Sequence, residues 1–235
     1  MRLSDRLELV VSTVLPQEAA ADVGTDHGHV PVELVRRGIA KRAYAMDVRK
    51  GPLSRAQENI AAAGLEEKIE TRLSDGVKEL KPGEAQAVII AGMGGELVIH
   101  ILEEGRHVWD FVEQWVLSPH SETDKVRKWL LEHGFPIASE KMVFEDGKYY
   151  TVLDVRKQGS MVVREIPEKR FLYGTCLVET KNPVFLNYLK DEERKLESLR
   201  DILSQQAERS GRAKESLAEV EEKLSINREV QNEMQ

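Results

Sequence analysis

The chain has 235 residues, of which 41% are hydrophobic and 32% are charged, and its formal net charge is -7. This size suits one α/β domain with a small appendage, and the hydrophobic content excludes general disorder. The acidic balance argues against binding nucleic acid through bulk charge, although a local basic surface is compatible with it.

The cysteine content and the N-terminal residues point to a cytoplasmic protein. Cys176 is the one cysteine, so no intramolecular disulfide can form, as is usual in a reducing compartment. No apolar signal segment follows Met1 to Arg6, and no apolar run approaches the roughly 18 residues of a transmembrane helix. We therefore expect no attachment to a membrane.

The first element is a helix that begins after the capping residue Ser4 and ends before Pro16. Its apolar side chains recur at helical spacing, at Leu3, Leu7, Val10, Val11 and Val14. We expect this helix to pack beside the first strand.

The stretch from Ala19 to His29 predicts a strand, a turn with two glycines and the start of a helix that runs from Val30 to Arg37. In α/β sheets, such a junction binds nucleotide-like ligands at the carboxyl ends of the strands. Gly24 would permit a tight turn, and Gly28 would let the backbone lie close to a ligand. A tight turn without a ligand is the alternative.

The glycine spacing does not match a dinucleotide-binding fingerprint, because Asp26 occupies the position of the middle glycine. A carboxylate at a helix N-terminus would repel a pyrophosphate and would suit a cation, such as the ammonium group of an amino acid. A nicotinamide-dependent reductase is therefore disfavoured. The pattern Asp22-x-Gly24-x-Asp26-x-Gly28 resembles motif I of class I methyltransferases that use S-adenosylmethionine (SAM).

Acidic residues also follow the next two predicted strands. Arg42 to Asp47 is a short apolar run whose final acid would reach the ribose hydroxyls of a nucleoside, or would cap the helix from Leu53 to Ala63. Ile69 to Ser74 alternates as a strand does and leads into Asp75-Gly76. This acid could accept from an adenine amino group, or the pair could form an ordinary turn.

The fourth strand, Ala87 to Ala91, is a continuous β-branched run and should be buried on both faces. Gly92-Met93-Gly94-Gly95 follows it, before a helix from Glu96 to Leu102. Three glycines in four residues would leave a nearly bare backbone where a flat substrate could approach. A flexible loop is the alternative.

The remaining elements of the sheet are a strand, a helix and a terminal hairpin. Gln114 to Ser118 is the fifth strand, and Val126 to His133 is a helix. Pro136 to Phe144 and Tyr149 to Val155 should pair antiparallel across the Asp146-Gly147 turn. Strands that alternate with helices and end in a hairpin predict an α/β, Rossmann-like sheet of seven strands.

The composition changes after Gly159, and two long helices are expected near the C-terminus. Asn182-Pro183 provides a cap and a first-turn proline, and Ser210-Gly211-Arg212 interrupts the pattern. Apolar side chains follow three- and four-residue steps at Leu186, Leu189, Leu196, Leu199, Leu203, Leu217, Val220 and Leu224. We expect an antiparallel α-helical coiled-coil hairpin. Its candidate partner-binding side chains are Lys190, Arg194, Lys195, Arg200, Arg209, Arg212 and Lys214.

These features occur in an order that resembles the bacterial TrmK family over essentially the whole chain. They are the Asp-His-Gly-His run at residues 26–29, Asp47, Asp75-Gly76, the Gly-Met-Gly-Gly run and the C-terminal helices. Members of this family are class I methyltransferases that modify N1 of the adenine at position 22 of tRNA, with SAM as cofactor. The resemblance implies a SAM-binding domain over residues 1–159, a connecting segment over 160–182 and a tRNA-binding coiled coil over 183–235. It also implies tRNA as the partner, and we expect a monomer.

The resemblance also implies roles for residues. Gly24 and Asp26 would hold the methionine end of SAM, Asp47 the ribose and Asp75 the adenine. The other cofactor-binding positions would be Gly28, Gly76, Ala91 and Gly92. Asp26, His27 and Met93 would serve the reaction itself. The substrate-binding positions would be His29, Gly94, Lys190, Arg194 and Arg200.

The sequence does not decide the roles of three histidines. His27 or His29 could line the base pocket, or both could orient the turn, and two histidines at i and i+2 without a third ligand do not indicate a metal. We therefore expect no metal site. A substrate role for His120, in Ser118-Pro119-His120, is undecided.

The residue pattern fits methylation of a ring nitrogen. Adenine N1 already has a lone pair and no proton, so positioning supplies most of the catalysis and no general base is needed before attack. A carboxylate nearby would stabilise the cationic product. Two alternative functions would also use a SAM site. In one, the protein is an enzyme that methylates a small molecule and its C-terminal helices serve dimerisation. In the other, it is a non-catalytic scaffold that binds SAM.

Overall fold

The computed structural model describes residues 3–157, 167–207 and 210–235. The chain divides into two compact units, Met1–Ile166 and Pro167–Gln235. Residues 160–166 of the expected connecting segment and Arg209 lie outside the described residues.

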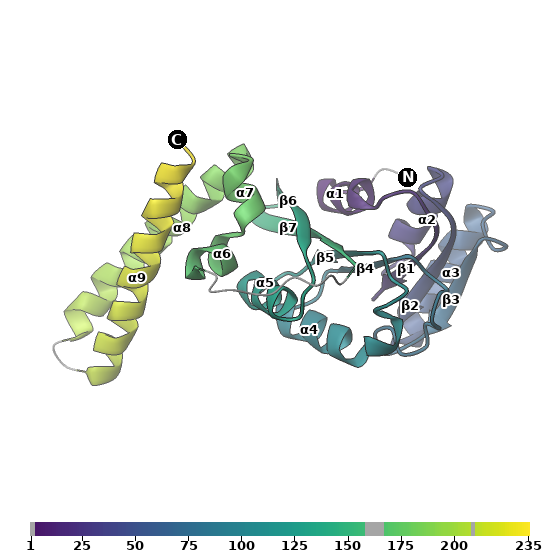
Figure 1. Ribbon diagram of the computed structural model, residues 1–235, viewed down its shortest axis with the longest axis horizontal. Coiled ribbons are helices and arrows are strands. Elements are labelled where there is room, and N and C mark those ends of the chain that lie inside the picture. Colours follow the sequence, from purple (N-terminus) through teal and green to yellow (C-terminus); the bar gives the residue numbers. More distant parts are fainter. Residues whose placement is uncertain (1–2, 158–166, 208–209) are drawn as a thin grey trace. The chain divides into compact units, whose positions relative to one another are not determined.

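The first unit alternates strands and helices along the chain (Figure 1). Its helices are α1 Asp5–Thr13, α2 His29–Arg36, α3 Lys50–Ala62, α4 Gly95–Glu104 and α5 Thr123–Glu132, with a short 3-10 helix, η1, at Arg106–Val108. Its strands are β1 Gln17–Val23, β2 Ala40–Asp47, β3 Ile69–Leu73, β4 Ala87–Ala91, β5 Gln114–Ser118, β6 Ile137–Glu145 and β7 Lys148–Arg156.

The strands form one sheet in the order β3-β2-β1-β4-β5-β7-β6, which confirms the predicted seven-stranded architecture. The first five are parallel, whereas β7 runs antiparallel to both β5 and β6. The parallel register pairs Val23 with Met46, Asp47 with Leu73 and Ala91 with Ser118. The carboxyl ends of five strands therefore meet along one edge of the sheet, where α/β proteins bind ligands.

Both faces of the sheet are covered, as the continuous apolar run of β4 predicts. Val88 and Ile90 pack into a cluster with α4 and α5, while Ala87 and Ile89 pack on the opposite face with α1 and α2. The helix α3 covers β2 and β3 beside α2. This three-layer packing holds the strand ends, and the loops that leave them, in fixed positions.

The cap predicted for the first helix is confirmed. The Ser4 side chain accepts a hydrogen bond from the Leu7 N–H group, so the N-terminal turn has one of its otherwise unpaired donors satisfied. The predicted hairpin of β6 and β7 also turns at Asp146 and Gly147, both of which have positive φ.

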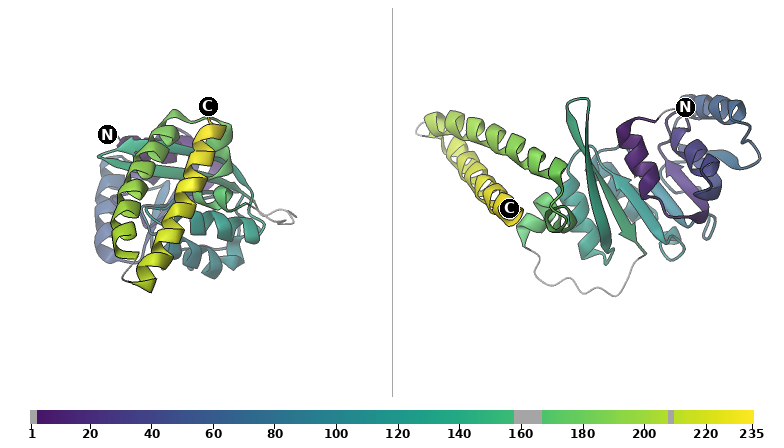
Figure 2. Two further views of the ribbon diagram at one scale, coloured as in Figure 1. Left: turned by 90° about the vertical axis from the view of Figure 1, so that its left-hand side faces the viewer. Right: turned by 90° about the horizontal axis from the view of Figure 1, so that it is seen from above.

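The second unit consists of helices. Two short ones, α6 Glu168–Tyr173 and α7 Thr175–Glu179, occupy a stretch in which no element was expected. Two long ones, α8 Pro183–Ala207 and α9 Gly211–Glu233, pack against each other as a hairpin (Figure 2). The Asn182 side chain accepts from the N–H groups of Val184 and Phe185, so the predicted cap of α8 is confirmed.

The interface between α8 and α9 is partly polar. Leu189 and Leu224 are buried in it, whereas Leu199 is 43% exposed, so the expectation that Leu199 belongs to the buried stripe is wrong. The buried Asn227 donates to the Leu189 carbonyl at 3.2 Å and to a Glu192 carboxylate oxygen at 2.9 Å. A buried amide with fixed partners on the facing helix favours one register, as polar residues do in other helix pairs.

Candidate functional site

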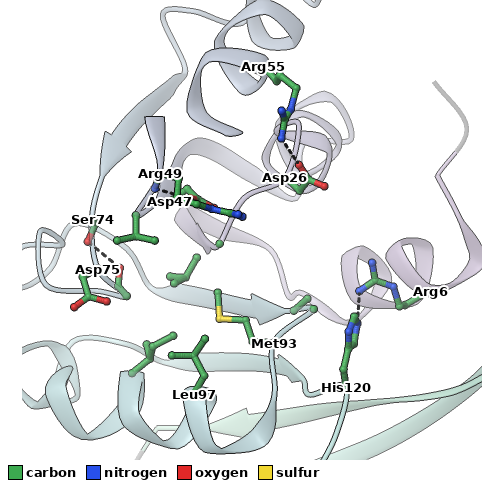
Figure 3. A pocket seen from close by; sticks show the side chains of 17 residues that line it. Arg6, Asp26, Asp47, Arg49, Arg55, Ser74, Asp75, Met93, Leu97 and His120 are labelled. Atoms are coloured by element: carbon green, nitrogen blue, oxygen red, sulfur yellow. Dashed lines mark hydrogen bonds and ion pairs between the residues drawn. The ribbon is translucent and has the colours of Figure 1, made fainter. Parts of the chain in front are cut away.

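A cavity of about 570 Å³ lies in the first unit, at the edge where the carboxyl ends of the parallel strands meet (Figure 3). This volume is typical of sites for small molecules and cofactors. The structure places eight of the predicted site residues on its wall: Gly24, Asp26, Asp47, Asp75, Gly76, Ala91, Gly92 and Met93.

The turn after β1 is held by two main-chain hydrogen bonds. The Gly24 and Thr25 N–H groups both donate to the Met46 carbonyl, each at 2.8 Å. Gly24 has a φ of +74°, a conformation that residues with a Cβ rarely adopt. The turn of β1 is therefore fixed to the end of β2, one residue before Asp47.

Met93 reaches from the loop after β4 toward the same turn. A Cβ placed on Gly24 would lie 2.1 Å from the Met93 Cε, so the thioether occupies space that the missing side chain leaves open. Met93 is half-buried and packs on the core beneath it. Figure 3 shows its sulfur between the loops that carry Asp47 and His120.

Asp47 both closes its own loop and lines the cavity. Its Oδ1 accepts from the Arg49 N–H group at 2.7 Å, and the Arg49 guanidinium lies 3.7 Å from the same oxygen. The carboxylate is buried, whereas the Arg49 side chain is largely exposed. Asp47 therefore organises its own loop and faces the cavity. The alternative that it caps the following helix is not supported, because Arg49 is the N-cap residue of α3 and that cap has no side-chain hydrogen bond.

The loop after β3 is more exposed. The Lys78 ammonium, 2.7 Å from the Asp75 carboxylate, lowers the pKa of that acid. A Cβ on Gly76 would lie 3.0 Å from two side-chain carbons of Ile101, so this glycine makes room for α4 as well as lining the cavity. The Ser74 hydroxyl donates to the Gly76 carbonyl at 2.8 Å and stabilises the turn.

Two large apolar side chains on the cavity wall are unusually exposed. Val48 is 61% exposed and Leu97 is 46% exposed, and they come from the loop after β2 and from α4. Apolar side chains beside a cleft with carboxylates at its ends suit a ligand that has a flat apolar part and polar groups around it.

Asp26 lies at the rim of the cavity and is already near a cation. One of its carboxylate oxygens is 3.4 Å from the Arg55 guanidinium and 3.5 Å from the His27 ring. An ammonium group that bound there would share this carboxylate with Arg55.

The two histidines in the turn lie apart from the cavity wall. The rings of His27 and His29 instead stack on each other, with centroids 5.4 Å apart and an interplanar angle of 8°. Burial lowers the pKa of His29, and the neighbouring His27 lowers it further. The Asn59 side chain donates to the His27 carbonyl at 2.9 Å, and this contact holds the turn against α3.

Two glycines predicted to contact ligands face other parts of the protein. A Cβ on Gly28 would lie 3.2 Å from the Ala56 Cβ, and one on Gly94 would lie 3.3 Å from the Ser121 hydroxyl. Neither residue lines the cavity. These positions are glycine because helix α3 and the loop after β5 approach closely, so their predicted roles toward cofactor and substrate are not supported by the geometry.

Sequence patterns do not indicate that Arg6 belongs to the site, and they leave the role of His120 undecided. The structure brings both to the cavity wall, Arg6 from α1 and His120 from the loop after β5. The Arg6 Nη1 atom lies 3.3 Å from the His120 Nε2. Burial lowers the pKa of His120, and the cationic Arg6 and Lys148 lower it further.

Other cavity residues follow the strands directly: Val48, Arg49 and Ser74. Their positions next to Asp47 and Asp75 were the signal that could have identified them. Arg55, Leu97 and Ile101 come from the helices α3 and α4, and only the packing of these helices brings them to the edge.

The predicted substrate-binding cations of α8 lie in the second unit. Lys190 is exposed, Arg194 forms an ion pair with Asp191, and Arg200 lies 2.7 Å from Asp201. Each pair joins one exposed and one half-buried side chain at the surface, so breaking it would cost little.

The structure shows no group of three or more potential metal ligands within residues 3–157, 167–207 and 210–235. In the same ranges, none of the helices has the length and apolar character required to cross a membrane.

Comparisons with known proteins agree with this geometry. Residues 3–153 match the family described as a methyltransferase domain. The chain is 32% identical over 237 residues to the tRNA (adenine(22)-N(1))-methyltransferase of Bacillus subtilis, covering 98% of this chain and 97% of that protein.

Two solved structures are also similar. A putative tRNA (m1A22) methyltransferase of Streptococcus pneumoniae in complex with S-adenosyl-L-methionine is 36% identical, with a TM-score of 0.85 and coverage of 98% and 100%. TrmK of M. capricolum in complex with S-adenosyl-homocysteine is 26% identical, with a TM-score of 0.85 and full coverage of both chains.

Asp22, at the end of β1, generates a prediction for stability. Burial and, to a smaller extent, the nearby Asp47 raise the pKa of its carboxyl, Thr25 acts in the opposite direction, and the pKa that results is about 6. Between about pH 4 and pH 6 the folded chain keeps this proton while the unfolded chain loses it, so the contribution of Asp22 to stability falls as the pH rises. The Asp22→Asn variant lacks this penalty and should gain about 3 kcal/mol relative to the parent between pH 4 and pH 7.

Urea denaturation of both proteins at several pH values measures this gain. The exposed Asp110→Asn change is the matched control for the loss of one carboxylate and should change the free energy of unfolding by less than about 0.5 kcal/mol. A difference for Asp22→Asn that is constant from pH 4 to pH 7 would contradict the assignment.

Proposed function

This chain belongs to the tRNA (adenine(22)-N(1))-methyltransferase family, and we propose that it transfers a methyl group from SAM to N1 of the adenine at position 22 of tRNA. The observation that carries this function is the cavity at the carboxyl edge, in which Asp47 and Asp75 follow adjacent parallel strands. The reaction is a group transfer, so the chain needs one binding site for SAM and an adjoining one for the target adenine.

The cavity residues fit SAM. The buried carboxylate of Asp47 can accept from the ribose hydroxyls, and the exposed Asp75 can accept from the adenine amino group. Val48 and Leu97 supply the apolar surfaces that a purine ring would cover. Gly24 and Asp26 lie toward the turn of β1, where the amino-acid part would bind.

When bound, SAM supplies an electrophilic methyl group attached to a sulfonium. Ala91, Gly92 and Met93, at the end of β4, line the cavity and would form the floor between the proposed cofactor and base sites. Adenine N1 carries a free lone pair, so the chain has to align the base and does not have to remove a proton first. Asp26 is our candidate for stabilising the positive charge that develops on the base.

The loop after β4 supports attack by a ring nitrogen. It reads Gly92-Met93-Gly94-Gly95 and lacks the proline and aromatic residues that receive an exocyclic amine in N6-methylating enzymes. N1 lies on the Watson–Crick edge, so the target adenine must be unpaired, in a non-canonical pair, or flipped out of the stack.

The helical hairpin of α8 and α9 is proposed to bind tRNA outside the cavity, through Lys190, Arg194 and Arg200. The surface ion pairs of Arg194 and Arg200 can be exchanged for contacts with phosphates at little cost. We further propose that the chain acts as a monomer in the cytoplasm, where its tRNA substrate is found.

The reaction can be tested on unmodified tRNA incubated with the protein and SAM. N1-methyladenine cannot form a Watson–Crick pair, so reverse transcription should stop next to position 22. The same tRNA with that adenine replaced by guanine is the control and should give no stop. Wild-type protein that binds SAM and yet produces no stop would refute the proposed reaction.

The role of Asp47 can be tested with the Asp47→Asn variant. The amide keeps one oxygen for the Arg49 N–H group but replaces an acceptor by a donor. SAM binding should weaken by about 10- to 100-fold, the range for losing a hydrogen bond to a charged group. Calorimetric titration measures this, with the exposed Asp110→Asn as control. Unchanged affinity in Asp47→Asn would exclude Asp47 as the ribose-binding residue.

The proposed role of α8 can be tested by changing Lys190, Arg194 and Arg200 together to glutamine. tRNA binding should weaken by about 10-fold or more, and the slope of log Kd against log salt should decrease by up to about 3. SAM affinity should not change. The control changes Lys41, Lys68 and Lys81, near the amino ends of β2, β3 and β4, to glutamine. An equal effect of both triple variants would argue against a specific role of α8.

A further inference from the structure

Three residues from separate parts of the first unit form one end of the cavity wall and its support. Arg6 comes from α1, His120 from the loop between β5 and α5, and Tyr150 from β7. Arg6 and His120 line the cavity, and the Tyr150 ring contacts both side chains. This cluster is distinct from Asp47 and Asp75, which lie on the opposite side of Met93 (Figure 3).

The His120 ring is held in one orientation and in one chemical form. The Arg6 Nη1 atom lies 3.3 Å from His120 Nε2. A guanidinium can only donate, so Nε2 is the acceptor and the neutral ring carries its proton on Nδ1. The Tyr150 ring meets the imidazole with centroids 5.4 Å apart at 61°, and the Arg6 guanidinium lies 5.4 Å from the centroid of the Tyr150 ring.

The imidazole approaches the backbone at the end of β4. A Cβ on Gly92, whose φ is +88°, would lie 3.8 Å from His120 Cε1 and 3.9 Å from Nε2. The two loops are also joined by a hydrogen bond of 2.8 Å from the His120 N–H group to the Met93 carbonyl. His120 therefore lies next to Gly92 and Met93, which form the proposed floor between the cofactor and the base.

A base taken out of an RNA stack needs a planar surface to replace its lost neighbours. The loop after β4 offers glycines and Met93 here, and His120 carries the one ring among the described residues that line the cavity. His120 is exposed, so its ring has accessible surface. A neutral ring is also suitable, because a charged imidazolium would repel the positive charge that develops on the adenine.

We propose that the His120 imidazole is the surface on which the target adenine stacks, and that Arg6 and Tyr150 are positioning residues that hold this ring in place. The inference rests on the proposed function, because it assigns the base-binding part of the same cavity. It extends that function by identifying where the substrate contacts the protein, and it gives α1 a role in substrate binding through Arg6.

The test compares four variants with the wild type by tRNA methylation kinetics and by SAM titration. His120→Ala removes the ring and should lower kcat/KM for tRNA by about 10- to 100-fold, as loss of a base-stacking partner does. His120→Phe keeps a ring and should stay within about threefold of the wild type. His120→Gln keeps hydrogen-bonding groups without a ring and should resemble alanine. His100→Ala, an exposed histidine of α4 outside the cavity, is the control and should have no effect.

The role of Arg6 is tested by combining substitutions. Arg6→Ala should lower kcat/KM for tRNA in the wild-type background and have a smaller effect in the His120→Phe background, because the hydrogen bond to the imidazole no longer exists there. All variants should bind SAM within about twofold of the wild type, as expected if this end of the wall does not contact the cofactor. Equal effects of Arg6→Ala in both backgrounds would overturn the positioning role.

Two results would overturn the stacking assignment. Full activity of His120→Ala would show that the ring does not contact the base, and recovery by His120→Gln without recovery by His120→Phe would assign a hydrogen bond instead. These outcomes are distinct from failure of the proposed function. In that case the wild type itself would bind SAM without methylating tRNA, and the stacking assignment would be overturned with it.

Discussion

The site depends on one pair of main-chain hydrogen bonds, from Gly24 and Thr25 to the Met46 carbonyl. They join the turn after β1 to the last residues of β2. This connection fixes the loop proposed to hold the amino-acid end of the cofactor relative to the acid proposed to hold its ribose. Gly24 is required for this arrangement because the turn needs a positive φ. The parallel register of β1, β2 and β4 then places Gly92 and Met93 beside them.

This arrangement suits a reaction that depends on alignment. The nucleophile in N1 methylation needs no activation by a base, so the protein contributes mainly by holding two flat molecules in a fixed relation. Loops that leave a rigid sheet can do this, because three packed layers restrict their movement. The same principle explains why α1, which lies outside the alternating pattern of strands and helices, can matter for function: it supplies Arg6 to the cavity wall.

Much of the architecture could be predicted from local patterns, because apolar runs, Asp-Gly turns and caps such as Ser4 and Asn182 act over a few residues. The acids Asp47 and Asp75 could be located for the same reason, since Asp47 ends β2 and Asp75 comes two residues after β3. The positions of Arg6 and His120 could not, because they depend on how distant segments pack.

The glycines show a related limit of sequence analysis. Gly24 and Gly92 line the cavity. At Gly28 and Gly94, by contrast, Ala56 and Ser121 lie close to where a side chain would begin. A glycine in a sequence can reflect a positive φ, a nearby ligand or a nearby part of the protein, and the sequence does not distinguish these causes. In the same way, helical periodicity placed Leu199 in the buried stripe of α8, although only one side of that helix is covered by α9.

The carboxyl edge of the sheet is proposed to bind a nucleoside attached to sulfur, with its ribose at Asp47 and its sulfur toward Gly92 and Met93. A crystal structure of the chain with S-adenosylhomocysteine tests this most directly. We expect the ribose hydroxyls to bind the Asp47 carboxylate, the adenine to lie between Val48 and Leu97, and the sulfur to face the side of the cavity that contains His120. A ligand bound elsewhere, or bound in the reverse direction with its amino-acid end at Asp75, would contradict this proposal.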